Sequence, residues 1–433
     1  MGQPGGADGR EAVHARTALL PESDPAAPGR GVLAAGGSSG SIALPPRSAA
    51  RPVAGTFGLQ ALVFGLVAAT IGTIYLTQPV LPEISQDFGA SPSMASLTVS
   101  MVILGITVAC MPFGVLADRW PIKPIILVGG VVIASSLLAG AFSQGLTLLV
   151  ALRFVQGLFV PALTSCLAAY LARSLPLESL AVVMGSYVSA TVVGGLSSRL
   201  LSGLVLVGHW RLSFVVTAAL VLLLTLAALR WLPPEGPRQP RGAASLSYLG
   251  LLRQRTTLAP YLATFGSMFV FAAVFNFITY HLAGPPFSAS TSFISLVYLT
   301  YLIGVVSGPL VGRLTRRIGG GWTLLLGAAF LVLALLVSLL PSLAAVVLSL
   351  ALVCAGHFTI HPAATGLLNV RLQGGQGRGN SLYVLIYYLG GWAGITAAGQ
   401  AWSLWAWPGV AGLCLLVLVL PLAVGLGEIW RKP

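Results

Sequence analysis

The sequence has few charged residues: Asp, Glu, Lys and Arg make up 8% of its 433 residues, whereas 56% are hydrophobic. About a quarter of the residues in soluble domains are charged, so this composition excludes an ordinary soluble protein. The apolar residues form runs of about 20, the length that a helix needs to cross a bilayer. The sequence therefore predicts an all-α protein that crosses a lipid bilayer many times.

Cysteines are also few, and nucleotide-binding loops are missing. The four cysteines lie in apolar runs without a CxxC or Cys/His grouping, so we expect packing residues and neither disulfides nor a metal site. No Gly-x4-Gly-Lys-Ser/Thr loop is present, which argues against ATP as an energy source. We expect no cofactor and no enzymatic activity, because an intramembrane enzyme would need a water-activating His/Asp/Glu or Ser/Lys set at one depth.

Acidic residues are scarcer than basic ones, 10 against 23, which leaves a net charge of +13. The basic residues are scattered through short loops and are not gathered on one face, so we expect no nucleic-acid partner. Most of them fall on alternate connections between the apolar runs. The positive-inside rule then predicts that both termini lie in the cytoplasm.

Twelve spans are predicted, in two halves of six. The expected organisation is a disordered cytoplasmic tail over 1–55, a six-helix bundle over 56–232, a Pro- and Arg-rich cytoplasmic linker over 233–257, a second bundle over 258–427 and a cytoplasmic C-terminus over 428–433. The predicted spans are 57–78, 94–116, 123–143, 146–171, 181–206, 212–232, 258–281, 291–313, 321–340, 343–368, 380–402 and 408–427.

A charged stretch between the second and third runs, Gly114–Lys123, has a weaker copy at Gly308–Arg313, about half the hydrophobic region later. Two copies at that offset indicate a duplicated bundle. The first stretch resembles the loop between helices two and three of major facilitator superfamily transporters. The matching residues are Gly114, Leu116, Ala117, Asp118, Arg119 and Lys123. The resemblance implies a gate in which Asp118 pairs with the start of helix eleven, near Asn380, in the outward-facing state; a role limited to setting topology is the alternative.

The fourth run contains Leu149-x3-Arg153-x2-Gln156-Gly157, which is similar to a fourth-helix motif of the same superfamily that is linked to proton transfer. An arginine inside a span costs at least about 2.5 kcal/mol on insertion, so it is kept where it meets a wet cavity or a partner. We expect Arg153 to face the cavity, where it perturbs the proton carrier or attracts an anionic substrate. Snorkelling of Arg153 to the lipid interface is the simpler alternative.

The fifth run keeps Gly185, Gly194 and Gly203 of the glycine motif typical of superfamily antiporters, but Ser198 and Arg199 replace its Gly-Pro. Small residues let helices approach closely, so we expect these glycines at the interface of the halves. This version of the motif is similar to that of bacterial inner-membrane transporters in the drug:proton antiporter group.

No Asp or Glu lies inside any predicted span, which leaves His357 and His361 as intramembrane candidates for carrying a proton. The two histidines are one helical turn apart, hence on the same face, and the ordinary pKa of histidine, near 6.5, suits proton exchange. A purely structural, hydrogen-bonded role is the alternative. Polar and aromatic residues predicted to line the substrate cavity are Tyr75, Gln78, Asn276, Tyr280, Tyr387 and Tyr388, although each tyrosine also suits an interfacial belt.

The sequence thus predicts a monomeric, twelve-helix carrier of a bacterial inner membrane, which exports small organic compounds, drug-like or sugar-like, in exchange for protons. Multidrug efflux is the function that the resemblance implies. An importer or uniporter of a sugar or metabolite stays open, because the spans lack a carboxylate. A non-transporting sensor would need a folded soluble domain, and neither the tail nor the linker supplies one.

Overall fold

This computed structural model describes residues 2, 56–235, 248–372 and 376–430. All regular elements in this part of the chain are helical. The long helices of the first half are α1 (Thr56–Tyr75), α4 (Leu97–Arg119), α5 (Ile122–Ala141), α6 (Leu146–Leu163), α7 (Ser165–Ser174), α8 (Leu177–Leu200) and α9 (Trp210–Trp231). Four short elements complete it: η1 (Gln78–Val80), α2 (Leu81–Asp87), α3 (Pro92–Ala95) and the π-turn η2 (Leu201–Val205).

The second half follows the same plan. Its elements are α10 (Tyr248–Arg253), α11 (Arg255–Ala283), α12 (Thr291–Leu296), η3 (Val297–Tyr301), α13 (Leu302–Ile318), α14 (Gly320–Val337), α15 (Leu343–Arg371), α16 (Gln376–Val417) and α17 (Val419–Trp430). Trp405 and Ala406 have non-helical backbone angles inside α16, so this long element is two helices joined at a kink.

Each predicted span coincides with one to three consecutive helical elements. Among the described residues, ten segments are long and apolar enough to cross a membrane. One of them, Arg378–Trp430, covers the last two predicted spans, and Thr291–Gly304 is a shorter apolar helix. The predicted linker is helical over α10 and the start of α11, while its middle lies outside the described residues. So do 431–433 and, apart from residue 2, the predicted tail.

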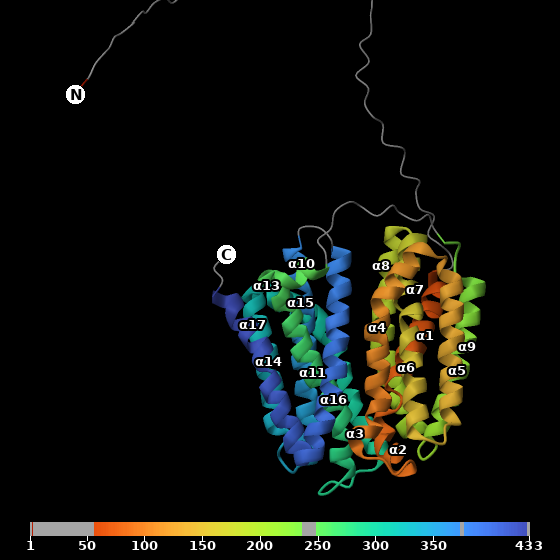
Figure 1. Cartoon of the computed structure of the whole chain (residues 1–433), viewed down its shortest axis with the longest axis vertical. Helices are drawn as coiled ribbons and strands as arrows, with labels where there is room; N and C mark the ends of the chain where they lie inside the picture. Colours follow the sequence, from red (N-terminus) through yellow and green to blue (C-terminus); the bar gives the residue numbers. More distant parts are fainter. Residues whose placement is uncertain (1, 3–55, 236–247, 373–375, 431–433) are drawn as a thin grey trace, which may run out of the picture. The chain divides into compact units, whose positions relative to one another are not determined.

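The two halves lie side by side and meet at the end that holds α2 and α3, where α16 packs against α4 and α3 (Figure 1). We call this end the sealed end. The opposite end, where α4 passes into α5 and α13 into α14, is the hinge end. Within the second half α11 is central: every residue from Gly266 to Tyr280 is buried, and α15, α16 and α17 pack against it.

The glycines of α8 and η2 allow close packing, but not all at the interface of the halves as predicted. A Cβ on Gly203 would stand 1.8 Å from Ser295 Oγ of the other half, so this position fits the prediction. A Cβ on Gly194 would stand 2.2 Å from the Ala68 carbonyl oxygen, so Gly194 instead joins α8 to α1 within the first half. Gly185 faces open space. The sequence motif identified close approaches without indicating which helix each one meets.

The contrast between two glycines of one helix gives a stability test. We expect Gly194→Ala to lower the melting temperature of the purified protein, because the added methyl group would collide with the α1 backbone at a cost of about 1–3 kcal/mol. Gly185→Ala on the same helix is the control, and we expect it to melt like the wild type. Equal melting temperatures for the two variants in thermal unfolding would contradict the described α1–α8 contact.

Candidate functional site

A cavity of about 530 Å³ lies between the halves. The first half contributes residues of α1, α4 and α8 to its wall, and the second half contributes residues of α11, η3, α15 and α16. The wall is rich in phenol side chains: Tyr75, Tyr187, Tyr301, Tyr383, Tyr387 and Tyr388. A chamber of this size and composition suits a small organic molecule with an aromatic or weakly polar body.

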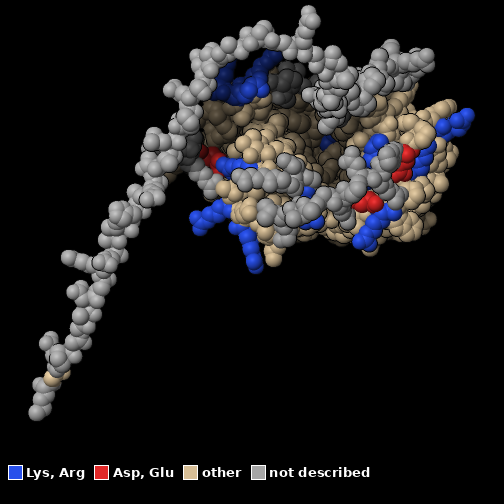
Figure 2. Space-filling view, turned by 90° about the horizontal axis from the view of Figure 1, so that it is seen from above, with Lys and Arg blue, Asp and Glu red and all other residues tan. Residues whose placement is uncertain are grey.

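Hydrogen bonds between the halves close the sealed end. The Tyr280 hydroxyl donates to the Leu81 carbonyl oxygen at 3.2 Å and shares a hydrogen bond with Ser85 Oγ at 2.8 Å. Asn276 Nδ2 donates to Ser96 Oγ at 2.7 Å, and Thr291 Oγ1 donates to Glu83 Oε1 at 2.8 Å. The hinge end, by contrast, is hollowed between the two halves, and basic side chains lie around the hollow (Figure 2). The chamber is thus barred at one end.

Asn276 and Tyr280 therefore belong to this seal and not to the cavity wall, where the sequence analysis placed them. They lie near the sealed end of α11. Tyr280 reaches Leu81 and Ser85 in α2, and Asn276 reaches Ser96, which follows α3. The interpretation failed because a polar residue on an apolar helix is equally suited to a cavity and to a contact between halves. Tyr75, Tyr387 and Tyr388 do line the cavity, as predicted, whereas Gln78 lies behind the wall, buried against Arg199.

Arg199 is the residue that the sequence analysis missed. Its side chain is 0% exposed, yet it forms part of the cavity wall. Its Nε donates to Gln78 Oε1 at 2.9 Å, one Nη donates to the Gly195 carbonyl oxygen, and the other donates to the Tyr301 hydroxyl at 3.0 Å. The Arg199 guanidinium therefore joins the two halves at the inner limit of the seal.

Three aromatic rings surround the same guanidinium. Its Cζ lies 4.2 Å from the ring centre of Tyr75, 4.5 Å from that of Tyr301 and 4.9 Å from that of Tyr298. Cation–π contacts of this kind stabilise a desolvated cation by about 2 kcal/mol.

An arginine inside an apolar run was the available signal for Arg199. The sequence analysis used this signal for Arg153 but treated Arg199 only as a departure from the glycine motif.

Arg153 is not on the cavity wall, which contradicts the expectation that it faces the cavity. It is 1% exposed and its donors are taken up within the first half: Nε by the Thr98 carbonyl, one Nη by the Thr73 carbonyl and Gln156 Oε1, the other by the Ile74 carbonyl, at 2.6–2.7 Å. These bonds hold α6 against α1 and α4. Arg153 and Gln156 thus form a structural clamp in this conformation.

His357 and His361 both line the cavity from α15, with ring centres 6.0 Å apart. His357 Nδ1 lies 2.9 Å from Ser267 Oγ, and its Nε2 lies 3.4 Å from the Tyr387 hydroxyl. His361 Nδ1 lies 3.0 Å from the Tyr383 hydroxyl. The helical spacing therefore predicted correctly that the two imidazoles share one face. These hydrogen bonds also fix the orientation of both rings.

The charged stretch at the hinge end is held within the first half. Asp118 Oδ1 pairs with Arg173 Nη2 at 3.0 Å, and Arg173 also donates to the Ala117 carbonyl oxygen at 2.9 Å. Lys123 Nζ donates to the Leu232 carbonyl oxygen at 2.9 Å. Gly114 faces open space, and Arg119 also belongs to this stretch. The predicted pairing of Asp118 with the start of α16 concerns another conformation and stays a prediction.

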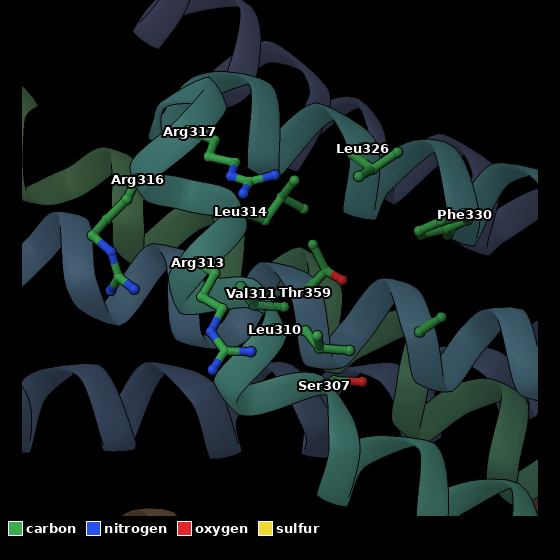
Figure 3. A pocket seen from close by; sticks show the side chains of 11 residues that line it. Ser307, Leu310, Val311, Arg313, Leu314, Arg316, Arg317, Leu326, Phe330 and Thr359 are labelled. Atoms are coloured by element: carbon green, nitrogen blue, oxygen red, sulfur yellow. The ribbon is translucent and has the colours of Figure 1, made fainter.

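Arg313, in the second copy of the stretch, lines a separate hollow of about 700 Å³ between α13, α14 and α15. In this hollow Arg313, Arg316 and Arg317 point in different directions beside Leu310, Leu326 and Phe330 (Figure 3). The second copy keeps only the positive charges of the first, because Gly312 stands where the first copy has Asp118.

A sequence profile described as the Major Facilitator Superfamily matches residues 62–395. The chain belongs to this superfamily. It therefore has the twelve-helix fold and the alternating-access architecture of these membrane transporters. The sequence resemblance to the superfamily is confirmed, and so is the predicted fold class.

Similar transporters come from several bacteria. The MFS-type transporter YybF of Bacillus subtilis is 30% identical over 85% of this chain and 93% of its own length. The inner membrane transport protein YnfM of Escherichia coli is 28% identical over 84% of this chain and 88% of its own length.

Among solved structures, a bacterial homologue of the human lysosomal transporter Spinster, inward-facing and occupied, matches with a TM-score of 0.70 at 15% identity, covering 86% of this chain and 96% of that one. The nucleoside transporter NupG matches with a TM-score of 0.70 at 12% identity, covering 86% and 98%. At these identities the structures support the fold alone.

From the seal between the halves we predict that Tyr280→Phe changes how often the sealed end opens. Losing the hydroxyl removes its bonds to Leu81 and Ser85, at a cost of about 1 kcal/mol, so conformations open at the sealed end should become about fivefold more populated. Spin labels on Gln86→Cys and Ser288→Cys, one in each half, would report this as a larger share of long distances. Tyr248→Phe, an exposed position far from the seal, is the control; an unchanged distance distribution in Tyr280→Phe would refute the proposed role of the seal.

Proposed function

We propose that this protein is a proton-coupled carrier that exports small organic compounds across the bacterial inner membrane without any enzymatic step. The observation that carries this proposal is the chamber between the halves, which is closed at the sealed end and has two neighbouring histidines in its wall. A carrier needs a binding site that faces one side at a time. It also needs a titratable group beside that site if protons drive it.

The distribution of basic residues supports an orientation for the chamber. The hinge-end connections carry Arg119, Lys123, Arg316 and Arg317, and the face seen in Figure 2 is rich in such side chains. By the positive-inside rule we assign this end to the cytoplasm, and we propose the same side of the membrane for both termini, as the sequence predicts. The chamber then faces inward, the state in which an exporter takes up its substrate. The Spinster homologue with which the chain shares its fold is described as inward-facing.

The histidine pair is the proposed proton site. Of the described residues that line the chamber, none is Asp or Glu, so the imidazoles are the side chains there whose ordinary pKa is nearest neutral. The ring centres of His357 and His361 are 6.0 Å apart, so the two imidazoles form one site. A proton that moves inward across a potential of 100 mV releases about 2.3 kcal/mol, enough to drive export against a concentration ratio of about fiftyfold.

The missing chamber carboxylate also keeps a second candidate in view, an importer or uniporter of the same fold. Everted membrane vesicles separate the two. With an acidic lumen imposed, a panel of dyes, drugs and sugars is added and collapse of the pH gradient is followed by fluorescence. Collapse that depends on this protein supports proton-coupled export. Counterflow of a solute without collapse supports a facilitator and contradicts the proton coupling.

His361→Asn tests the proton site directly. We expect it to abolish pH-driven transport while counterflow of the same solute continues, because asparagine keeps a polar group near Tyr383 but cannot take up a proton near neutral pH. His209→Asn is the matched control, because His209 is exposed in the loop before α9, outside the chamber wall. Retention of gradient-driven transport in His361→Asn would remove His361 from the mechanism.

Asp118 is the proposed latch of the outward-facing state. We expect the halves to close at the hinge end when Asp118 leaves Arg173 and pairs with the N-terminus of α16, where a carboxylate is favourable. Asp118→Asn should therefore slow transport and favour the inward-facing state. The check is labelling of Tyr387→Cys by a membrane-impermeant thiol reagent in everted vesicles: faster labelling is expected, and an unchanged rate and unchanged transport would contradict the latch.

A further inference from the structure

Arg199 brings a guanidinium into a chamber wall whose described residues supply no carboxylate. The guanidinium stays protonated in proteins, and no Asp or Glu is present among the described residues that line the chamber. Buried charges are ordinarily paired, because removing an ion from water costs several kcal/mol. The first uncommon feature of this site is therefore a buried cation whose described partners are all neutral: Gln78, Gly195, Tyr75, Tyr298 and Tyr301.

The hydrogen bonds of Arg199 leave it with at least one unused donor. A guanidinium has five N–H groups, and the bonds to Gln78, Gly195 and Tyr301 use three of them. The Tyr298 hydroxyl also interacts with the guanidinium, so at least one N–H group is left without a partner among the described residues. A carboxylate that meets the two Nη atoms can accept from this N–H group and compete with the Tyr301 hydroxyl for another. The second feature of the site is thus a donor that an anion can use.

Aromatic side chains continue from Arg199 across the chamber. Phe271 lies 5.2 Å from Tyr301, and on its other side it stacks on His357 at 4.2 Å between ring centres. These residues all line the chamber. An apolar or aromatic body could lie along them while its charged end meets Arg199. A cationic solute, by contrast, would meet uncompensated positive charge there.

We infer that the chamber binds small organic anions, namely carboxylates with an aromatic or apolar body, and that Arg199 is the residue that binds the carboxylate. This inference rests on the proposed function, because it takes the chamber as the transport site, and it adds the class of substrate. The same contact links binding to movement. Tyr301 belongs to the second half and Gln78 to the first, so an anion that takes over the Nη donors weakens a bond between the halves.

Matched probes test this with the full-length protein in nanodiscs. The probes are phenylacetate, cinnamate and naphthoate, each compared with its own carboxamide, and phenethylammonium as a cation. Isothermal titration calorimetry should show each carboxylate binding about 10- to 100-fold more tightly than its amide, the ratio expected for hydrogen bonds to a charged group. Phenethylammonium should bind more weakly still. Carboxylates that bind no better than their amides, or do not bind, overturn the inference.

Two variants locate the effect. Gln78→Glu keeps the shape of the side chain that accepts from Arg199 Nε but supplies an internal carboxylate, so it should abolish the preference for carboxylates over amides. Arg199→Gln should do the same by removing the charge. The control Arg211→Gln removes an exposed arginine that pairs with Asp87 at 2.6 Å outside the chamber, and it should keep the wild-type preference. A wild-type preference in Gln78→Glu overturns the role of Arg199, even if Arg199→Gln fails to fold.

The same probes in the everted-vesicle assay separate this inference from the proposed function. A carboxylate that binds through Arg199 but never collapses the pH gradient supports the anion site and contradicts proton-coupled export. A neutral solute that collapses the gradient, together with carboxylates that bind no better than their amides, supports export and overturns the anion site.

Discussion

Contact between the two halves at the sealed end is the constraint on which the site depends. Side chains of α11 and α12 reach residues in and around α2 and α3, and Gly203 lets η2 approach Ser295 closely. With the halves held together there, the chamber between them is bounded by Arg199 and its aromatic partners on the side of the seal. A transporter with this architecture changes access by exchanging such contacts at one end for contacts at the other.

Two buried arginines show how the surroundings of a charge decide its role. Backbone carbonyls and Gln156 take up the donors of Arg153 inside one half, so this charge holds α6 to its neighbours. Arg199 reaches both halves and borders the chamber, so its contacts lie where the halves must separate. Burying either guanidinium in a low-dielectric interior costs free energy. The hydrogen bonds within the first half offset this cost for Arg153, whereas Arg199 keeps donor capacity for a ligand.

Much of the fold was predictable because the bilayer imposes it. Every backbone polar group inside a membrane must be satisfied within its own helix, so apolar runs of about 20 residues mark the spans. The turn-spaced histidines were likewise placed correctly on one face of α15. The contacts of Asn276, Tyr280, Arg153 and Gly194 were not predictable, because each depends on which neighbour a helix face meets. No periodicity within a single helix encodes that neighbour.

The sequence by itself determined a membrane carrier of duplicated six-helix halves. Its hydrophobic runs mark the spans, its repeated charged stretch marks the duplication, and the first copy of that stretch matches the superfamily. Local rules sufficed there, since span length and motif spacing are properties of single segments. Only the tertiary structure decided that Arg199, Tyr301 and the histidine pair share one chamber and that Asn276 and Tyr280 close its far end. The reason is physical: these groups come from different helices, and their proximity is set by how the two halves pack.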